Sequence, residues 1–251
     1  GTAYLERFGD RVRTMVLDGA IDPDQNPLDS LVEQMAGFQV AFNDYAADCA
    51  TSPACPLGTD PAQFVNRYHQ LVNPLVAKPG PTTDPRGLSY SDAITGTVNA
   101  LYTPQYWKYL TSGLLGLQRG ADADDLLMLA DDYDGRDDDG HYGNGQDAFN
   151  AIRCVDSPTS GDPAVWAQVD KQIRQRAPFL SYGQFTGFAP RDLCAFWPVP
   201  PTSSPHVVAP APAGSVVVVS TTHDPATPYE AGVDLARQLH APLITSDGTQ
   251  H

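Results

Sequence analysis

The sequence predicts an α/β protein in which a long helical insertion separates two parts of a parallel sheet. Residues 215–221 read SVVVVST, a run of valines typical of a strand buried on both faces of a parallel sheet. A turn, a helix and a second strand follow this run, and the N-terminal residues supply another helix and strand. The residues between these parts show helical periodicity and no convincing long strand.

Residues 1–27 are predicted to form the first part of the sheet core. TAYLERF reads as a helix, GDR as a turn, and VRTMVLDGAID as a buried strand that ends in a loop of Gly and Asp. Asp18 in this loop is interpreted as a structural residue.

Residues 28–205 are predicted to be mainly helical, because apolar side chains recur at steps of three and four. We interpret these side chains as core positions and not as a cofactor site. They are Leu28, Leu31, Val32, Met35, Phe42 and Tyr45; Phe64, Tyr68, Leu71, Val72 and Leu75; Ile94, Val98 and Leu101; Trp107, Leu110, Leu114 and Leu117; and Val165, Trp166, Val169 and Ile173.

An Asp- and Gly-rich stretch, residues 121–145, interrupts these helices and is predicted to be a solvated loop. It does not match the calcium-binding loop, because neither Gly135 nor Gly140 has acidic residues at all the required preceding positions.

Residues 206–251 are predicted to complete the sheet. A Pro-rich, extended connection leads into the valine strand, and HDPATP then forms a turn. The next helix is opened by Pro228, with Thr227 as the candidate cap. PLITSDGTQH supplies a short strand, a turn and His251.

The charge of the chain limits its partners. The formal net charge is −15, so the surface repels phosphate backbones and nucleic acid is a poor candidate. Peptides with a free amino group would be attracted. No stretch approaches the roughly 20 apolar residues that cross a bilayer.

The four cysteines suggest an oxidising compartment. Cys49 and Cys55 bracket a short loop, and Cys154 and Cys194 flank a helical stretch, so two disulfides are expected. Four buried free thiols are the alternative. Zinc binding is disfavoured because no CxxC or nearby Cys/His pair supplies the ligand spacing.

Asp224 and His251 are the candidate catalytic residues. Each follows one of two successive strands, so both are expected at the carboxyl edge of the sheet, where α/β proteins bind ligands. A carboxylate that accepts a hydrogen bond from one imidazole nitrogen fixes the tautomer that lets the other nitrogen take a proton from a serine.

No G-x-S-x-G serine motif is present in the chain. Ser181, in LSYGQ, lacks the leading glycine and does not follow a strand, so it is interpreted as a coincidental match. Because the nucleophile turn immediately precedes a helix and this chain begins with one, we expect the serine to lie just before Gly1. Both ends of the sequence look cut.

Several segments together resemble the secreted tripeptidyl aminopeptidases, a branch of the proline-iminopeptidase-like serine peptidases with the α/β-hydrolase fold. They are GTAYLERFGDRVRTMVLDGAIDP, AIRCVDSP, DLCAFWPV, HDPATPYEAGVDLARQL and GTQH. The resemblance implies an α/β-hydrolase core with a helical cap at residues 28–205, from which the N-terminal part of the core is absent. It also implies an upstream signal peptide or lipid anchor and no metal or cofactor.

Within this resemblance, Asp224 and His251 correspond to two members of the catalytic triad. The resemblance also pairs Cys154 with Cys194 and Cys49 with Cys55 as disulfides. Of the other polar residues, Thr227 lies near the expected site, and Asp156 is a candidate to bind the ammonium group of a substrate.

The expected activity is the release of short peptides, tripeptides by resemblance, from the N-terminus of polypeptides outside the cell or in its envelope. One alternative is a secreted carboxylesterase or lipase with the same triad, because the triad does not choose the leaving group. The other is a secreted binding domain without catalysis. The 251 residues alone are expected to fold poorly and to be inactive, because the sheet would keep an unpaired edge.

Overall fold

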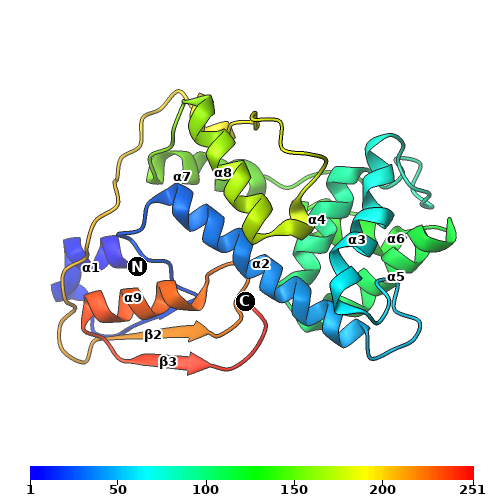
Figure 1. The fold of residues 1–251 in the computed structure, drawn as a ribbon. Coiled ribbons are helices and arrows are strands. Elements are labelled where there is room, and N and C mark those ends of the chain that lie inside the picture. The colour runs from blue at the N-terminus through cyan, green and yellow to red at the C-terminus, as the bar shows by residue number, and fades with distance from the viewer.

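The computed structural model describes residues 1–251 and contains one three-stranded parallel sheet. The strands β1 (Met15–Asp18), β2 (Val216–Thr221) and β3 (Leu243–Ser246) lie in the order β1-β2-β3 (Figure 1). Leu17 pairs with Val218, which pairs in turn with Leu243. The predicted parallel sheet is therefore present, with β1 much shorter than the segment predicted as strand.

One face of the sheet is covered by helices α1 (Thr2–Phe8) and α9 (Tyr229–Leu239). The 3-10 helix η1 (Gly9–Arg11) follows α1 directly and has no buried residue. Leu5 and Leu235 pack with Val216 and Val218 in a small buried cluster. On the opposite face Val217 and Val219 are only half-buried, Val16 is 66% exposed and Ile244 is 55% exposed. The prediction that β2 is buried on both faces is therefore wrong, because helices cover only one face, and β1, predicted to be a buried strand, is exposed at Val16.

Between β1 and β2 the chain forms only helices and loops, which we call the cap. Figure 1 shows α2 crossing from the region beside the sheet to the helices at the other end of the molecule. The cap elements are α2 (Pro27–Cys49), η2 (Pro61–Gln63), α3 (Phe64–Val72), η3 (Asn73–Val76), α4 (Tyr90–Leu101), η4 (Pro104–Tyr106), α5 (Trp107–Arg119), α6 (Asp124–Asp134), α7 (Gly145–Asp156), α8 (Pro163–Arg176), η5 (Pro178–Leu180) and η6 (Leu193–Phe196).

The cap has its own hydrophobic core, a cluster of 25 buried residues that is much larger than the cluster on the sheet. Phe42 and Phe179 stack at its centre, with ring centroids 4.7 Å apart, and Tyr68 contacts both rings. Ala226, from the turn after β2, belongs to the same cluster. The turn that follows the central strand is therefore packed into the cap.

Helix α6 corrects the prediction of a solvated loop over residues 121–145. Its apolar face is buried between α4 and α5, and Leu126 lies so close to α5 that a Cβ on Gly113 would be 2.6 Å from the Leu126 Cβ. Seven residues of the helix are neither Leu nor Ala, and most of these are Asp. Because the composition is so acidic, the short apolar face of the helix was not recognised from the sequence. Helix α7 was also missed, since Cys154 is its only buried residue.

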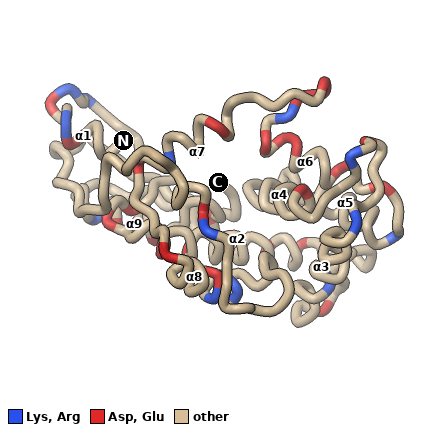
Figure 2. Tube along the Cα trace, turned by 90° about the horizontal axis from the view of Figure 1, so that it is seen from above, with Lys and Arg blue, Asp and Glu red and all other residues tan.

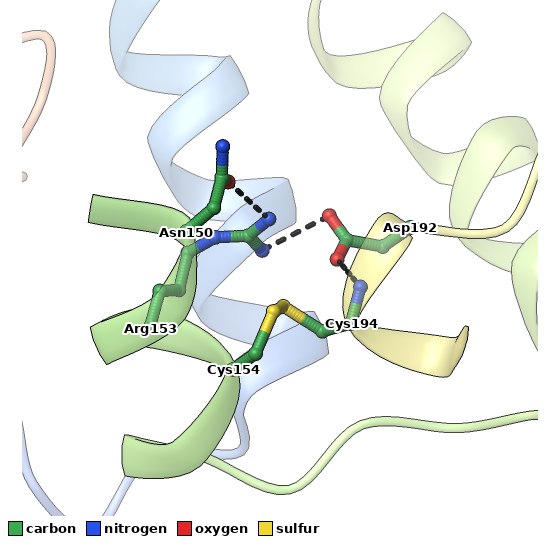
Figure 3. Close-up of a disulfide and its surroundings, with 5 residues drawn as sticks. All are labelled: Asn150, Arg153, Cys154, Asp192 and Cys194. Atoms are coloured by element: carbon green, nitrogen blue, oxygen red, sulfur yellow. Dashed lines mark hydrogen bonds and ion pairs between the residues drawn. A yellow bond between two sulfur atoms is a disulfide. The ribbon is translucent and has the colours of Figure 1, made fainter. Parts of the chain in front are cut away.

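Both cysteine pairs are disulfides in the structure. Cys49 is bonded to Cys55 at the end of α2, and Cys154 joins α7 to Cys194 of η6. Figure 3 shows an ion pair beside the second disulfide, with the Arg153 guanidinium 3.0 Å from the Asp192 carboxylate. The disulfide and the ion pair together attach η6 to α7.

Loss of the Cys154–Cys194 disulfide is expected to destabilise the protein more than loss of Cys49–Cys55. The two bonds close sequence separations of 40 and 6 residues. Chain entropy then predicts about 4 kcal/mol for the longer loop and about 2 kcal/mol for the shorter one. Urea unfolding of two double Cys→Ser variants of the full-length protein measures the difference. Equal losses would contradict this ranking.

Candidate active site

Asp224 and His251 lie together beyond the carboxyl ends of β2 and β3. The His251 Nδ1 atom is 3.0 Å from Oδ2 and 3.1 Å from Oδ1 of Asp224. The Asp224 side chain is 3% exposed and that of His251 is 39% exposed. The buried carboxylate thus faces one ring nitrogen, while the imidazole remains open to solvent on another side.

The carboxylate of Asp224 is held by the turn that carries it. Its Oδ1 accepts hydrogen bonds from the backbone N–H groups of Ala226 and Thr227, at 2.9 and 2.8 Å. Its Oδ2 accepts from the Thr227 hydroxyl at 2.9 Å. These donors satisfy a buried charged group that would otherwise be costly to desolvate.

Thr227 is not a helix cap, which corrects the prediction. The N-cap of α9 is Pro228, and no side chain caps this helix. The Thr227 hydroxyl instead lies between the two candidate catalytic side chains, bonded to Asp224 and 3.3 Å from the His251 Nδ1 atom. Its placement near the site agrees with the sequence, but its partners in the structure are protein side chains.

His251 is restrained on two further sides. Its backbone N–H donates to the carbonyl oxygen of Tyr102 at 2.9 Å, and the two rings meet edge to face, with centroids 5.6 Å apart. Gly19, at the end of β1, has a φ of +57°, and a Cβ there would lie 3.1 Å from the His251 Cε1 atom. All three side-chain hydrogen bonds of His251 use Nδ1, which leaves Nε2 for a substrate or nucleophile.

Helix α2 supports the turn of Asp224 from the cap side. Gln34 Nε2 donates to the carbonyl oxygen of Ala226 at 2.7 Å. A Cβ on Gly37 would lie 2.8 Å from the carbonyl oxygen of Pro225, so the helix and the turn are in close backbone contact. The position of the carboxylate therefore depends on the cap as well as on the sheet.

Replacing Gly37 with Ala is expected to lower activity about 10-fold, because the new methyl group must displace the Asp224 turn. The control is Gly145→Ala at the start of α7, where a Cβ would meet no atom within 4 Å. Hydrolysis rates of the two variants of the full-length protein provide the comparison. A Gly37→Ala variant as active as the control would contradict this role.

The supporting residues Gly19, Gly37 and Tyr102 were not found by sequence reasoning. A glycine directly after a strand and a glycine inside a helix both carry a weak signal, since each often marks a left-handed turn or a close backbone approach. Tyr102 carries no such signal, because its contact with His251 joins residues far apart in the chain.

Ser181 and Asp156 both belong to the cap, and neither side chain forms a hydrogen bond with Asp224 or His251. Ser181 follows η5, not a strand. Asp156 ends α7 on the disulfide-linked segment, is exposed, and forms no hydrogen bond or ion pair with His251 or Asp224. Ser181 thus lacks the strand that precedes a nucleophile turn, and a substrate contact of Asp156 stays a prediction.

The charges of the chain are scattered over its surface. Figure 2 shows acidic positions at the end of α6 and on the loop before α7, with one basic position between them. Burial raises the pKa of the Tyr102 phenol, so this ring beside His251 stays neutral.

No group of three or more His, Cys, Asp or Glu side chains is placed to hold a metal ion. None of the helices is both long and apolar enough to cross a lipid bilayer.

Comparison with known families gives two matches. Residues 1–168 match the family model described as alpha/beta hydrolase fold, and residues 177–251 match the model described as TAP-like protein. Together the two matches include β1, the cap except for residues 169–176 at the end of α8, and the strands that carry Asp224 and His251 to the site.

Comparison with curated proteins gives relatives of different names. Carboxylesterase B of Mycobacterium tuberculosis is 78% identical over 247 residues, which are 98% of this chain and 48% of that protein. Serine protease Hip1 of the same species is 56% identical over 260 residues, 100% of this chain and 49% of the relative. Tripeptidyl aminopeptidase of Streptomyces lividans is 23% identical over 259 residues, 98% of this chain and 45% of the relative. The chain spans about half the length of these curated relatives.

Proposed function

Because the chain belongs to the alpha/beta hydrolase fold family, we propose that Asp224 and His251 are two members of the catalytic triad of a serine hydrolase that cleaves carboxylic esters. The observation that carries this proposal is the hydrogen bond of 3.0 Å between His251 Nδ1 and the buried Asp224 carboxylate. The third member is a serine outside these 251 residues, as expected from the absence of a nucleophile motif.

The geometry supports the following mechanism. Asp224 accepts the Nδ1–H of His251, so Nε2 is unprotonated and can take the proton of the serine hydroxyl as the serine oxygen attacks the ester carbonyl. His251 then returns this proton to the leaving alcohol, and an acyl-enzyme remains. Water then gives a proton to the same Nε2 atom as its oxygen attacks the acyl carbonyl. The bond between the serine oxygen and the acyl group breaks, His251 returns the proton to the serine oxygen, and the free acid leaves.

Carboxylic esters are the better supported substrate class. The relative at 78% identity is named a carboxylesterase, whereas the relative named a tripeptidyl aminopeptidase is 23% identical. Peptide hydrolysis, the activity expected from the sequence, is the second candidate. The name of the serine protease at 56% identity favours it. The net charge of −15 would also attract a peptide with a free amino terminus.

The experiment compares short-chain p-nitrophenyl esters with tripeptidyl anilides as substrates of the full-length protein. Rapid ester hydrolysis with little anilide cleavage supports the esterase, and the reverse result supports the peptidase. A His251→Ala variant must lose the activity in either case. If the wild type hydrolyses neither class and a fluorophosphonate probe labels no serine, a binding domain without catalysis replaces the proposal.

We also propose that the protein works in an oxidising compartment, outside the cell or in its envelope. The two disulfides, Cys49–Cys55 and Cys154–Cys194, support this location. Cell fractionation, followed by mass spectrometry without reduction, tests it. Finding the protein in the cytosol with four free thiols would overturn it.

A further inference from the structure

Tyr102, at the C-terminal end of α4, is the cap residue that holds His251. Its carbonyl oxygen accepts the backbone N–H of His251, and its ring packs at 80° to the imidazole. On its other sides the ring contacts Phe38, at 5.4 Å between centroids, and Tyr133, at 6.2 Å. The imidazole therefore rests against an aromatic ring that is itself packed between two others.

The end of α4 is firmly attached to the rest of the cap. The side-chain amide of Asn99 is buried and donates to the carbonyl oxygen of Leu129 at 2.8 Å and to Asp132 at 3.0 Å, both in α6. The backbone N–H of Tyr102 closes the last turn by donating to the Asn99 carbonyl at 3.2 Å. Helix α6 thus fixes the position from which Tyr102 reaches His251.

The sheet provides less restraint at this point. After β3 the loop is bound to the sheet at Gly248, whose carbonyl oxygen accepts the backbone N–H of His223 and whose N–H donates to Thr222. At His251 itself the main-chain hydrogen bond goes to the cap, to Tyr102. The hydrogen bond to Asp224 fixes the position of the Nδ1 atom. The imidazole ring could still rotate about this hydrogen bond, and Gly19 on one side and Tyr102 on the other limit that rotation.

We propose that Tyr102 is a positioning residue for catalysis: its ring keeps the His251 imidazole in the orientation that points Nδ1 at Asp224 and Nε2 at the nucleophile. This inference rests on the proposed hydrolase function. If Tyr102 has this role, helix α4 must keep its position beside the active site during catalysis. A movement of the cap that lifted α4 away from the sheet would release His251.

The test uses three variants in the full-length protein. Tyr102→Phe keeps the ring and is expected to hydrolyse the best substrate within about 2-fold of the wild-type kcat. Tyr102→Leu and Tyr102→Ala remove it and are expected to lower kcat about 10-fold to 100-fold, with KM changed less than about 3-fold, because a misplaced catalytic group affects the chemical step. Tyr90→Ala is the control, since Tyr90 is a partly buried cap tyrosine that packs on Tyr182, at 5.5 Å.

Rates are expressed per folded molecule, with the folded fraction taken from circular dichroism and gel filtration. The leucine variant preserves much of the packing against Phe38, so a result is available even if the alanine variant does not fold. Unchanged kcat in Tyr102→Leu, or an equal loss of kcat in Tyr90→Ala, would overturn the inference. If the wild type is inactive, or His251→Ala is as active as the wild type, it is the proposed function that fails.

Discussion

Replacing Asp224 with Asn is expected to lower kcat/KM of the full-length protein by about 10⁴-fold. The amide oxygen can still accept the backbone N–H groups of Ala226 and Thr227, so the turn keeps its shape. The amide nitrogen, however, replaces the oxygen that is 3.0 Å from His251 Nδ1. An N–H donor at this position selects the tautomer in which Nε2 carries the proton, and Nε2 then cannot accept the proton of the serine.

Asp234→Asn is the control for this variant, since Asp234 lies on the exposed side of α9 and pairs with Arg237. It removes the same charge without contact to the site and should retain wild-type activity. His251→Ala should lose more than Asp224→Asn, because it removes the base itself, and the double variant should lose little more than His251→Ala, because residues that act as one unit are not additive. If Asp224→Asn keeps more than about a tenth of the wild-type kcat/KM, the proposed role of the carboxylate is wrong.

The parallel sheet and the Asp–His pair could be predicted because each depends on a short, continuous segment. The valine run of β2 identifies a strand by composition, and chain order places Asp224 and His251 at the ends of successive parallel strands. Since such ends meet at one edge, proximity followed without knowledge of any side-chain contact. The helices with regular apolar spacing, such as α2 and α5, were predicted for the same reason.

Other parts of the site could not be predicted, because they depend on contacts between distant segments. The residue on which the His251 ring rests is 149 positions earlier in the chain, at Tyr102. Thr227 had the right spacing for a helix cap, yet the hydroxyl bonds to the Asp224 carboxylate, which is a stronger acceptor than a neutral group. The local sequence shows which hydrogen-bond partners such a hydroxyl could have, but the partner that it actually binds depends on the tertiary structure.

Gly19→Ala is expected to lower activity about 100-fold, although Gly19 is not a member of the proposed triad. Gly19 continues the pairing of β1 with β2, since its N–H donates to the Val219 carbonyl at 3.2 Å, so the backbone here cannot easily move away. An alanine Cβ would lie 3.1 Å from His251 Cε1 and 3.1 Å from the Thr227 hydroxyl oxygen. The methyl group would therefore push both the imidazole and the hydroxyl out of line with Asp224.

Part of the effect of this substitution comes from the backbone alone, because a φ of +57° costs an alanine about 1 kcal/mol. Gly183→Ala isolates that part, since Gly183 has a φ of +58° and a Cβ there would meet no atom within 4 Å. Both variants should lose thermal stability, measured by circular dichroism, and Gly19→Ala should lose more because its Cβ also meets side chains, but only Gly19→Ala should lose kcat. If kcat falls equally in both, general strain explains the loss, and close contact at the imidazole does not.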